Sequence, residues 1–122
     1  MKALVVDDSV LARNMLAAVL DQAGFSAVDH AADGREAIQQ VENNAYDVVL
    51  LDWNMPNMLG LDALKEIRSL GKQMPVIMVT SISDSKRVQE AIEAGANGYV
   101  LKPFKPDDLI EKVRDALPGQ AA

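Results

Sequence analysis

The sequence predicts an α/β fold, a doubly wound sheet of five parallel strands with helices on both faces. Short apolar runs alternate with amphipathic stretches five times along the chain, which is the pattern of a (βα)5 series. One of these runs, Val48–Leu51, contains only Val and Leu and is bounded by turn-forming residues. Such a run is typical of a strand buried on both faces, and therefore of a parallel sheet covered by helices on each side.

Length and composition indicate one domain. The 122 residues, 49% hydrophobic and 25% charged, suffice for one core, so we expect a domain at residues 1–117 and a flexible tail at 118–122. The net charge of −6 argues against direct nucleic-acid binding, which requires Lys and Arg to neutralise phosphates. Because no run approaches 18 apolar residues and no secretory leader is recognisable, we expect a cytoplasmic protein without membrane insertion.

The first half of the chain predicts two strand–helix pairs. Ser9 or its neighbour Asp8 is a good N-cap, and Gly24 is a typical residue just beyond a helix end. The expected elements are a strand at Lys2–Asp7, a helix with apolar residues Ala12, Met15, Leu16, Val19 and Ala23 at three-or-four spacing, a weaker strand near Ser26–Ala31, and a helix from about Gly34 to Asn43.

The second half continues the alternation after the Val48–Leu51 strand. Asn54 and the Met55–Pro56 pair end that strand, because Pro lacks the amide donor that a sheet ladder needs. The expected elements are a helix from about Leu59 to Leu70 with Leu61, Leu64, Ile67 and Leu70 facing the sheet, a strand at Val76–Thr80, a helix capped by Asp84 or Ser85 and carrying Val88, Ala91 and Ile92, a strand at Gly98–Lys102, and a last helix with Pro106 in its first turn.

Four of the five predicted strands end in polar residues of particular kinds. These residues are the pair Asp7 and Asp8, Asp52, Thr80 and Lys102. The carboxyl ends of parallel strands lie on one edge of the sheet, where open α/β sheets bind their ligands. We therefore expect these side chains, scattered over most of the sequence, to meet in one cleft.

This combination of side chains predicts magnesium-dependent phosphoryl transfer. Three carboxylates within a few ångströms repel one another, at ~4 kcal/mol per pair at 4 Å and an effective dielectric of 20, so a cation is needed. Oxygen-only ligands favour Mg²⁺, and the backbone carbonyl of Asn54 could supply one more oxygen. Lys102 offers an ammonium and Thr80 a hydroxyl, both suited to phosphoryl oxygens, with an Asp carboxylate as the acceptor.

With these residues in order, the chain resembles the receiver domain of two-component response regulators over essentially its full length, most closely the stand-alone chemotaxis type. The resemblance rests on Asp7-Asp8-Ser9, on the run Asp52-x-x-Met55-Pro56-x-x-x-Gly60, on Thr80 followed by a small residue, and on Lys102-Pro103-Phe104. It implies the flavodoxin-like strand order 2-1-3-4-5. It also implies a cis bond between Lys102 and Pro103.

The resemblance further implies a role for each residue. Asp52 would accept a phosphoryl group from the phosphohistidine of a histidine kinase or a histidine phosphotransfer protein. Mg²⁺ would be held by Asp7, by Asp8 as the nearer ligand, by Asp52 and by the Asn54 carbonyl. Lys102 and Thr80 would contact the phosphoryl oxygens, and Tyr99 would be the aromatic switch residue. Ser81 stands where the family usually has Ala or Gly, and its hydroxyl could alter access of the phosphoryl group. Asn54 and Ser83 lie where the family varies the phosphoryl lifetime, so that lifetime is not implied.

The implied protein is a regulator and not an enzyme acting on outside substrates. It would catalyse its own phosphorylation, lose the group slowly and act as a monomer. It would then bind a downstream effector through the fourth helix, fifth strand and fifth helix, where Lys86, Arg87, Glu90, Tyr99 and Lys105 are the exposed candidates. Trp53 is expected to flank the cleft partly exposed and to report on it.

Two other functions are compatible with the pattern. One is a phosphohydrolase that forms an aspartyl-phosphate. Such enzymes carry an Asp-x-Asp motif after the first strand and an inserted cap, whereas this sequence has Asp7-Asp8 at that position and no recognisable cap. The other is an interaction module of the same fold without phosphorylation, whose usual mark is the loss of the acceptor, the lysine or an acid. All of these residues are present here.

Overall fold

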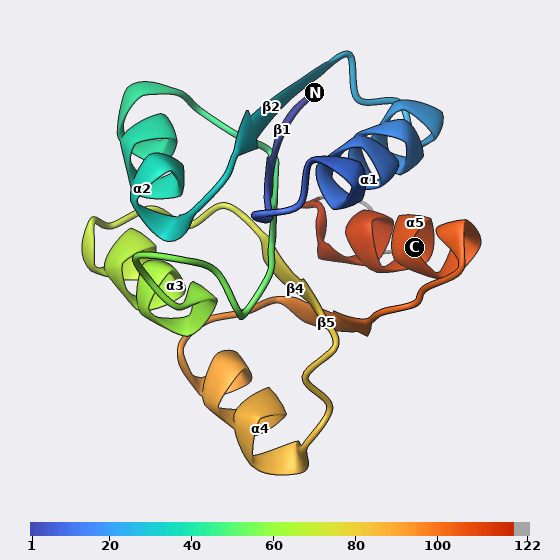
Figure 1. The fold of residues 1–122 in the computed structure, drawn as a ribbon. Helices are drawn as coiled ribbons and strands as arrows, with labels where there is room; N and C mark the ends of the chain where they lie inside the picture. The colour runs from blue at the N-terminus through green and yellow to red at the C-terminus, as the bar shows by residue number, and fades with distance from the viewer. Residues whose placement is uncertain (119–122) are drawn as a thin grey trace.

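The computed structural model describes residues 1–118 as a five-stranded parallel sheet between two layers of helices (Figure 1). The predicted tail at 118–122 lies outside the described residues except for Pro118. The elements are β1 (Lys2–Val6), α1 (Val10–Gln22), β2 (Ala27–Ala31), α2 (Gly34–Asn43), β3 (Val48–Leu51), α3 (Gly60–Ser69), β4 (Val76–Thr80), α4 (Ser85–Glu93), β5 (Gly98–Leu101) and α5 (Pro106–Ala116).

The strand order is β2-β1-β3-β4-β5 with every pair parallel, which confirms the predicted topology. β3 lies in the centre, and its four residues are all buried, as the continuous apolar run predicts. β2 and β5 form the two edges, and each has a single buried residue, Ala31 and Val100 respectively. None of the helices within residues 1–118 has the length and hydropathy that crossing a membrane requires.

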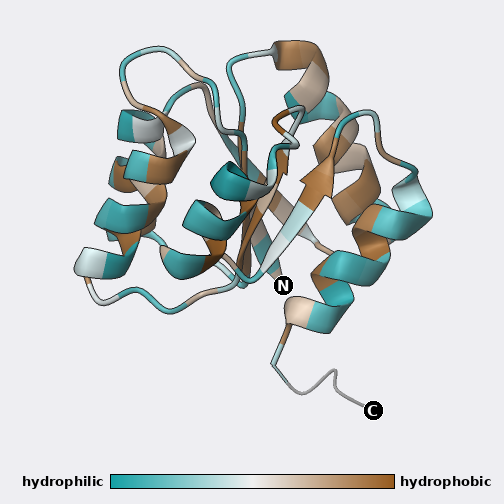
Figure 2. Ribbon diagram, turned by 90° about the horizontal axis from the view of Figure 1, so that it is seen from below, coloured by the Kyte–Doolittle hydropathy of each residue, from teal (hydrophilic) through white to brown (hydrophobic). Residues whose placement is uncertain are grey.

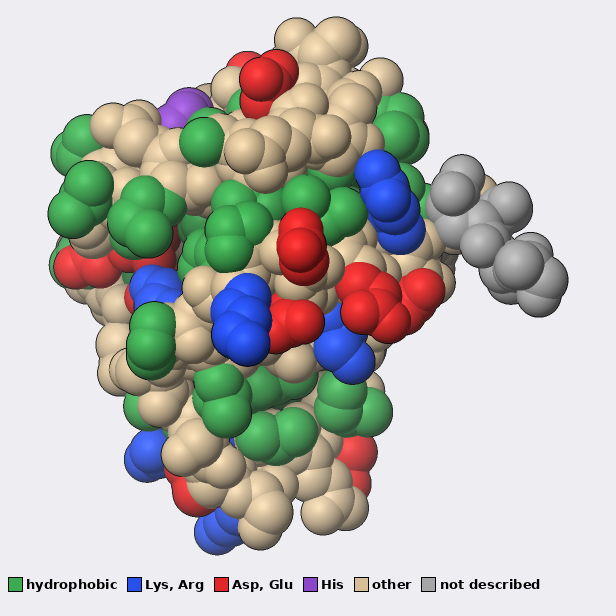
Figure 3. All heavy atoms as spheres, turned by 90° about the vertical axis from the view of Figure 1, so that its right-hand side faces the viewer, with side chains coloured by type: hydrophobic (Ala, Val, Ile, Leu, Met, Phe, Trp, Pro, Cys, Tyr) green, Lys and Arg blue, Asp and Glu red, His purple; other side chains and the backbone are tan. Residues whose placement is uncertain are grey.

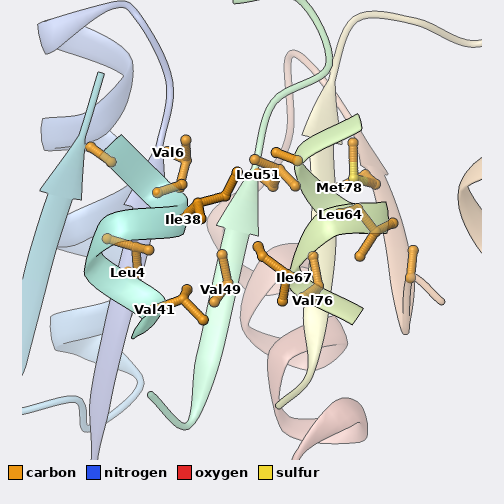
Figure 4. Packing of buried hydrophobic residues seen from close by; sticks show 14 of the residues in the cluster. Leu4, Val6, Ile38, Val41, Val49, Leu51, Leu64, Ile67, Val76 and Met78 are labelled. Carbon is orange, nitrogen blue, oxygen red and sulfur yellow. The ribbon is translucent and has the colours of Figure 1, made fainter. Parts of the chain in front are cut away.

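Two hydrophobic clusters cover the two faces of the sheet. Figure 2 shows the apolar strands between helices that mostly turn hydrophilic residues outward, whereas α1 also exposes Val10, Leu11 and Met15. One cluster packs α2 and α3 against β1, β3 and β4, and the close-up in Figure 4 shows Ile38 and Leu64 reaching from these helices toward the strands. The other cluster packs α1 and α5 on the opposite face, where Leu16, Leu20 and Leu109 are buried. The rigid sheet therefore fixes the position of its own carboxyl edge.

α3 and α4 differ in how much they bury. α3 buries five of its residues, including Leu64 and Ile67, whereas Ala91 is the only buried residue of α4. The guanidinium of Arg68 in α3 donates to the carbonyl oxygen of Gly95 at 2.8 Å, just beyond the end of α4. Figure 1 shows α4 standing apart from the other helices at the β5 side of the sheet. α4 is therefore the least anchored of the five helices.

Leu70, which was predicted to face the sheet, is exposed, and so are Met15 and Ile92 from the apolar positions of the first and fourth predicted helices. Met15, Leu70 and Ile92 are 54%, 44% and 49% exposed. α3 ends at Ser69, so Leu70 lies beyond the helical stripe. Met15 and Ile92 are each one residue away from a buried position, and one residue turns a helix by about 100°.

Candidate functional site

The carboxyl ends of the strands bring the predicted side chains together. We define the carboxyl-edge cluster as Asp7, Asp8, Asp52 and Lys102. The three carboxylates each offer an oxygen within 4.8 Å of the others. The Lys102 Nζ donates to Asp7 Oδ2 at 2.6 Å and to Asp52 Oδ2 at 3.3 Å. Residues that follow β1, β3 and β5, separated by 44 or more positions in the sequence, therefore share one site.

Asp7 is the most firmly held member of the carboxyl-edge cluster. Its side chain is buried, and its Oδ1 accepts a hydrogen bond from the Ser9 amide at 2.9 Å. Its own amide donates to the Ala31 carbonyl, and its carbonyl accepts a bond from Arg13 Nη1 at 2.7 Å. Asp8, by contrast, is exposed. One carboxylate of the pair is thus fixed and the other faces solvent.

Asp52 begins the turn that follows β3 and is partly buried. Its Oδ1 accepts a hydrogen bond from the Trp53 amide at 2.7 Å. Burial raises the pKa of the Asp52 carboxyl above its usual value, and the charge of Asp7 raises it further. The Lys102 ammonium, the Thr80 hydroxyl and the Trp53 amide lower the pKa but do not cancel the rise. The ionised form of Asp52 is therefore less favourable in the folded protein than in the unfolded chain.

Lys102 follows β5 and supplies the positive charge of the carboxyl-edge cluster. Burial alone would lower the pKa of its ammonium, but the hydrogen bond to Asp7 and the charges of Asp52 and Asp7 raise it above its usual value. Lys102 therefore stays charged at neutral pH. The Lys102–Pro103 peptide bond is cis, as the resemblance implied.

Gly60 closes the loop that starts at Asp52. Its amide donates to the Trp53 carbonyl at 2.7 Å. A Cβ atom at this position would overlap the backbone carbonyl of Asp52, so no larger residue fits without moving the loop. The sequence run Asp52–Gly60 contains this glycine, but the close contact depends on the folded backbone and could not be predicted from the sequence.

The remaining predicted residues lie around the cluster. Thr80 ends β4, is buried, and its Oγ1 accepts a hydrogen bond from the Ile82 amide at 3.3 Å. Tyr99 is half-buried, and its hydroxyl donates to the Ile82 carbonyl at 2.6 Å, outside the carboxyl-edge cluster. Burial and the charges of Asp84 and Asp52 raise the Tyr99 pKa. Asn54 lies exposed in the turn after Asp52.

The prediction that Trp53 is partly exposed is wrong. Its side chain is only 5% exposed and belongs to the hydrophobic cluster under α2 and α3, together with Met55. The tight turn between β3 and α3 directs the ring into the core while its backbone stays beside the Asp52 carboxylate. Trp53 is therefore a buried neighbour of the site.

The donor atoms of the carboxyl-edge cluster fit a hard divalent cation. All of them are carboxylate oxygens, and Mg²⁺ prefers oxygen ligands to the nitrogen and sulfur that favour zinc. The exposed position of Asp8 leaves room for water molecules, which Mg²⁺ usually keeps in proteins. Three carboxylates with a single ammonium also leave negative charge for a cation to neutralise.

A second group of ionisable side chains lies toward the amino ends of β1 and β3. We define the amino-edge cluster as Lys2, Asp29 and Tyr46. The Tyr46 hydroxyl donates to Asp29 Oδ2 at 2.6 Å, and the Lys2 Nζ lies 3.4 Å from the same oxygen. The hydrogen bond from Tyr46 outweighs burial and, with Lys2, lowers the pKa of Asp29. This cluster has one carboxylate matched by one ammonium and carries no excess charge.

Comparison with known proteins gives a family and several relatives. A family model described as the response regulator receiver domain matches residues 3–114. The chain is 40% identical to the chemotaxis protein CheY-3 of Vibrio cholerae over 115 residues, 93% of this chain and 88% of that protein. It is 42% identical to the chemotaxis protein CheY1 of Helicobacter pylori over 120 residues, 96% of this chain and 97% of that protein.

Solved structures show the same fold. Vibrio cholerae CheY4 superposes with a TM-score of 0.88 at 37% identity, covering 95% of this chain and 98% of that one. A complex of CheX and CheY from Borrelia burgdorferi with beryllium fluoride and Mg²⁺ gives a TM-score of 0.91 at 32% identity, covering 94% of this chain and 87% of that one.

Proposed function

The chain belongs to the response regulator receiver family, and from this premise we propose that Asp52 accepts a phosphoryl group from the phosphohistidine of a histidine kinase or a histidine phosphotransfer protein. The observation that carries the proposal is the geometry around Asp52, whose carboxylate lies among two further acids with the Lys102 ammonium 3.3 Å away. This is the set of charges that phosphoryl transfer requires.

In the proposed reaction a carboxylate oxygen of Asp52 attacks the phosphorus atom of the phosphohistidine. An oxygen–phosphorus bond forms while the phosphorus–nitrogen bond breaks, and the imidazole leaves with the electron pair. Asp52 becomes an acyl phosphate. The receiver thus catalyses its own phosphorylation and, by slow hydrolysis of the acyl phosphate, its own return to the resting state.

The surrounding residues neutralise the charge of the transferred group. Asp7, Asp8, Asp52 and the Asn54 carbonyl would hold Mg²⁺, which when bound supplies positive charge to the phosphoryl oxygens. We propose that Lys102, which now contacts both Asp7 and Asp52, turns toward a phosphoryl oxygen once Asp52 is modified. The Thr80 hydroxyl, which lowers the pKa of the Asp52 carboxyl, would donate a hydrogen bond to a second phosphoryl oxygen.

The proposed signal passes from Thr80 to the β4–α4 connection. Thr80 Oγ1 binds the amide of Ile82 and the Tyr99 hydroxyl binds the carbonyl of the same residue, so Ile82 joins the two predicted switch residues. A shift of Thr80 toward the phosphoryl group would remove one of these two restraints. Phosphorylation changes the populations only by its different contacts in the two states.

We propose that a downstream effector binds the face built from α4, β5 and α5. A groove of about 540 Å³ lies along this face between Tyr99 and Lys112. Lys86, Arg87 and Lys105 are exposed, and Glu90 and Tyr99 are partly buried. Figure 3 shows charged side chains of both signs across this side of the molecule, with hydrophobic side chains above and below them. The proposal keeps the protein in the cytoplasm, the compartment that the sequence predicts.

The direct test is phosphorylation with acetyl phosphate and with a phosphorylated histidine phosphotransfer domain, in Mg²⁺ and in chelator. We expect one added phosphoryl group by mass spectrometry in Mg²⁺, none in Asp52→Asn, and normal uptake in the control Asp29→Asn. Absence of uptake by the wild-type chain, with both donors active on another receiver, would overturn the proposal. Multiple-turnover release of phosphate from varied phosphomonoesters would instead favour a phosphohydrolase.

A further inference from the structure

Arg13 contacts the acidic pair through the backbone. Its Nη1 donates to the Asp7 carbonyl at 2.7 Å, across the short connection through which the chain turns from β1 into α1 (Figure 1). This carbonyl belongs to the peptide bond between Asp7 and Asp8. Arg13 therefore restrains the Asp7–Asp8 peptide, whose orientation sets the position of the Asp8 Cα atom.

The guanidinium of Arg13 is partly removed from solvent. Its Nε is buried and has no hydrogen-bond partner among residues 1–118. A buried donor without a partner is unfavourable, and Arg side chains normally keep their nitrogens in water or in a pair. The side chain thus leaves Nε without a hydrogen bond while Nη1 keeps its contact with the Asp7 carbonyl.

Asp7 and Asp8 differ in what holds them. The carboxylate of Asp7 has its own restraints, because Oδ1 binds the Ser9 amide and Oδ2 binds Lys102. Asp8 is exposed, so the orientation of its peptide limits where its carboxylate can reach. Arg13 restrains that peptide through the Asp7 carbonyl.

We propose that Arg13 is a positioning residue for divalent-cation binding, which orients the Asp7–Asp8 peptide so that the Asp8 carboxylate meets those of Asp7 and Asp52. The inference rests on the proposed function only in taking the carboxyl-edge cluster as a cation site. Residues that orient the ligands of a metal typically change its affinity 10- to 100-fold when they are replaced.

Charge and position predict opposite results for Arg13→Met. Removing a positive charge near a cation site tightens cation binding by reducing repulsion. Removing a restraint on the Asp7–Asp8 peptide weakens cation binding, because the ligands are no longer held ready. The sign of the change therefore distinguishes a positioning role from an electrostatic one, and a purely structural role would leave the affinity unchanged.

The experiment is a calorimetric titration of the full chain with Mg²⁺. Urea unfolding of the metal-free proteins checks that each variant is folded. We expect Arg13→Met to raise the Kd for Mg²⁺ about 10-fold. Arg13→Lys, which keeps the charge and one donor but lacks the planar fork, should raise it less. The matched control is Arg35→Met on the exposed surface of α2, which should leave the Kd within about twofold.

A second readout does not depend on the metal. In NMR spectra of the metal-free protein, the backbone amide signals of Asp8 and Ser9 should shift in Arg13→Met and stay in place in Arg35→Met. Equal or tighter Mg²⁺ binding by Arg13→Met would overturn the inference. If that variant does not fold, unchanged binding by Arg13→Lys would overturn it instead. Wild-type protein that fails to bind Mg²⁺ would overturn the cation site of the proposed function, and this inference with it.

Discussion

The carboxyl-edge cluster and the amino-edge cluster both combine aspartate with one lysine, but only the carboxyl-edge cluster has more carboxylates than ammonium groups. In the first, three carboxylates share the single ammonium of Lys102, and the pKa of Asp52 is raised. In the second, one carboxylate has an ammonium and a phenol hydroxyl, and the pKa of Asp29 is lowered. The first cluster thus keeps excess negative charge, whereas the charges of the second are balanced. On the proposed function, this difference separates ionisable groups that serve chemistry from groups that support the fold.

The largest expected difference concerns the two lysines. Lys102→Met leaves Asp7 buried and Asp52 partly buried without their ammonium, which should lower the free energy of unfolding by about 3 kcal/mol in metal-free protein. Lys2→Met removes an ion pair whose side chains are about one third exposed, which should cost only about 0.5 kcal/mol. Urea unfolding at pH 7 with chelator measures both values. Equal losses would mean that the two clusters are electrostatically alike.

Magnesium should distinguish the clusters by binding only one of them. Ligand linkage predicts a gain in the free energy of unfolding of about 2.7 kcal/mol at a Mg²⁺ concentration 100 times the Kd. Asp8→Asn should reduce this gain, because it removes an exposed ligand without disturbing the core. Asp29→Asn should leave the gain unchanged. Thermal or urea unfolding at several Mg²⁺ concentrations measures it, and a gain that survives in Asp8→Asn but not in Asp29→Asn would place the cation at the wrong end of the sheet.

The smallest expected effects are those of replacing one Asp by Asn in each cluster, and they have opposite signs. Asp52→Asn should stabilise the metal-free protein at pH 7 by about 1 kcal/mol, since it removes an unfavourable partly buried charge. Asp29→Asn should destabilise it by about 1 kcal/mol, since it weakens the acceptor of the Tyr46 hydroxyl. Both values come from urea unfolding in chelator.

The same two variants should differ in their pH dependence. The raised pKa of Asp52 means that the folded wild-type protein takes up a proton before the unfolded chain does, so the advantage of Asp52→Asn is full above the raised pKa and fades toward about pH 4. The lowered pKa of Asp29 means that its contribution is full above about pH 4 and is lost only at more acidic pH. A stabilising effect of Asp52→Asn that persists at pH 3 would contradict this account.

Much of the fold could be predicted from the sequence because it depends on periodicity. A parallel sheet follows from the buried strand Val48–Leu51 and from the alternation of strands with helices. The carboxyl edge of that sheet brings Asp7, Asp52 and Lys102 together, independently of the loop conformations. The roles assigned to these residues remain predictions until phosphorylation is measured. The strand order came from the resemblance and is confirmed by the structure.

The details that were missed depend on where individual side chains point. Trp53 turns into the core and Leu70 lies beyond the end of α3, and neither direction follows from hydropathy. The contact of Arg13 with the Asp7 carbonyl joins a side chain to a backbone atom, which no residue pattern records. The contact of Gly60 with the Asp52 backbone likewise requires the path of the folded loop.

On the proposed effector-binding face, the sparse packing of α4 separates folding from recognition. Because Ala91 is its only buried residue, most positions of this helix can be substituted with little change in the stability of the domain. A duplicated copy of such a chain could acquire a new binding partner through changes on α4 while its core and its carboxyl-edge cluster stayed the same. One scaffold can in this way diversify into many signalling pathways.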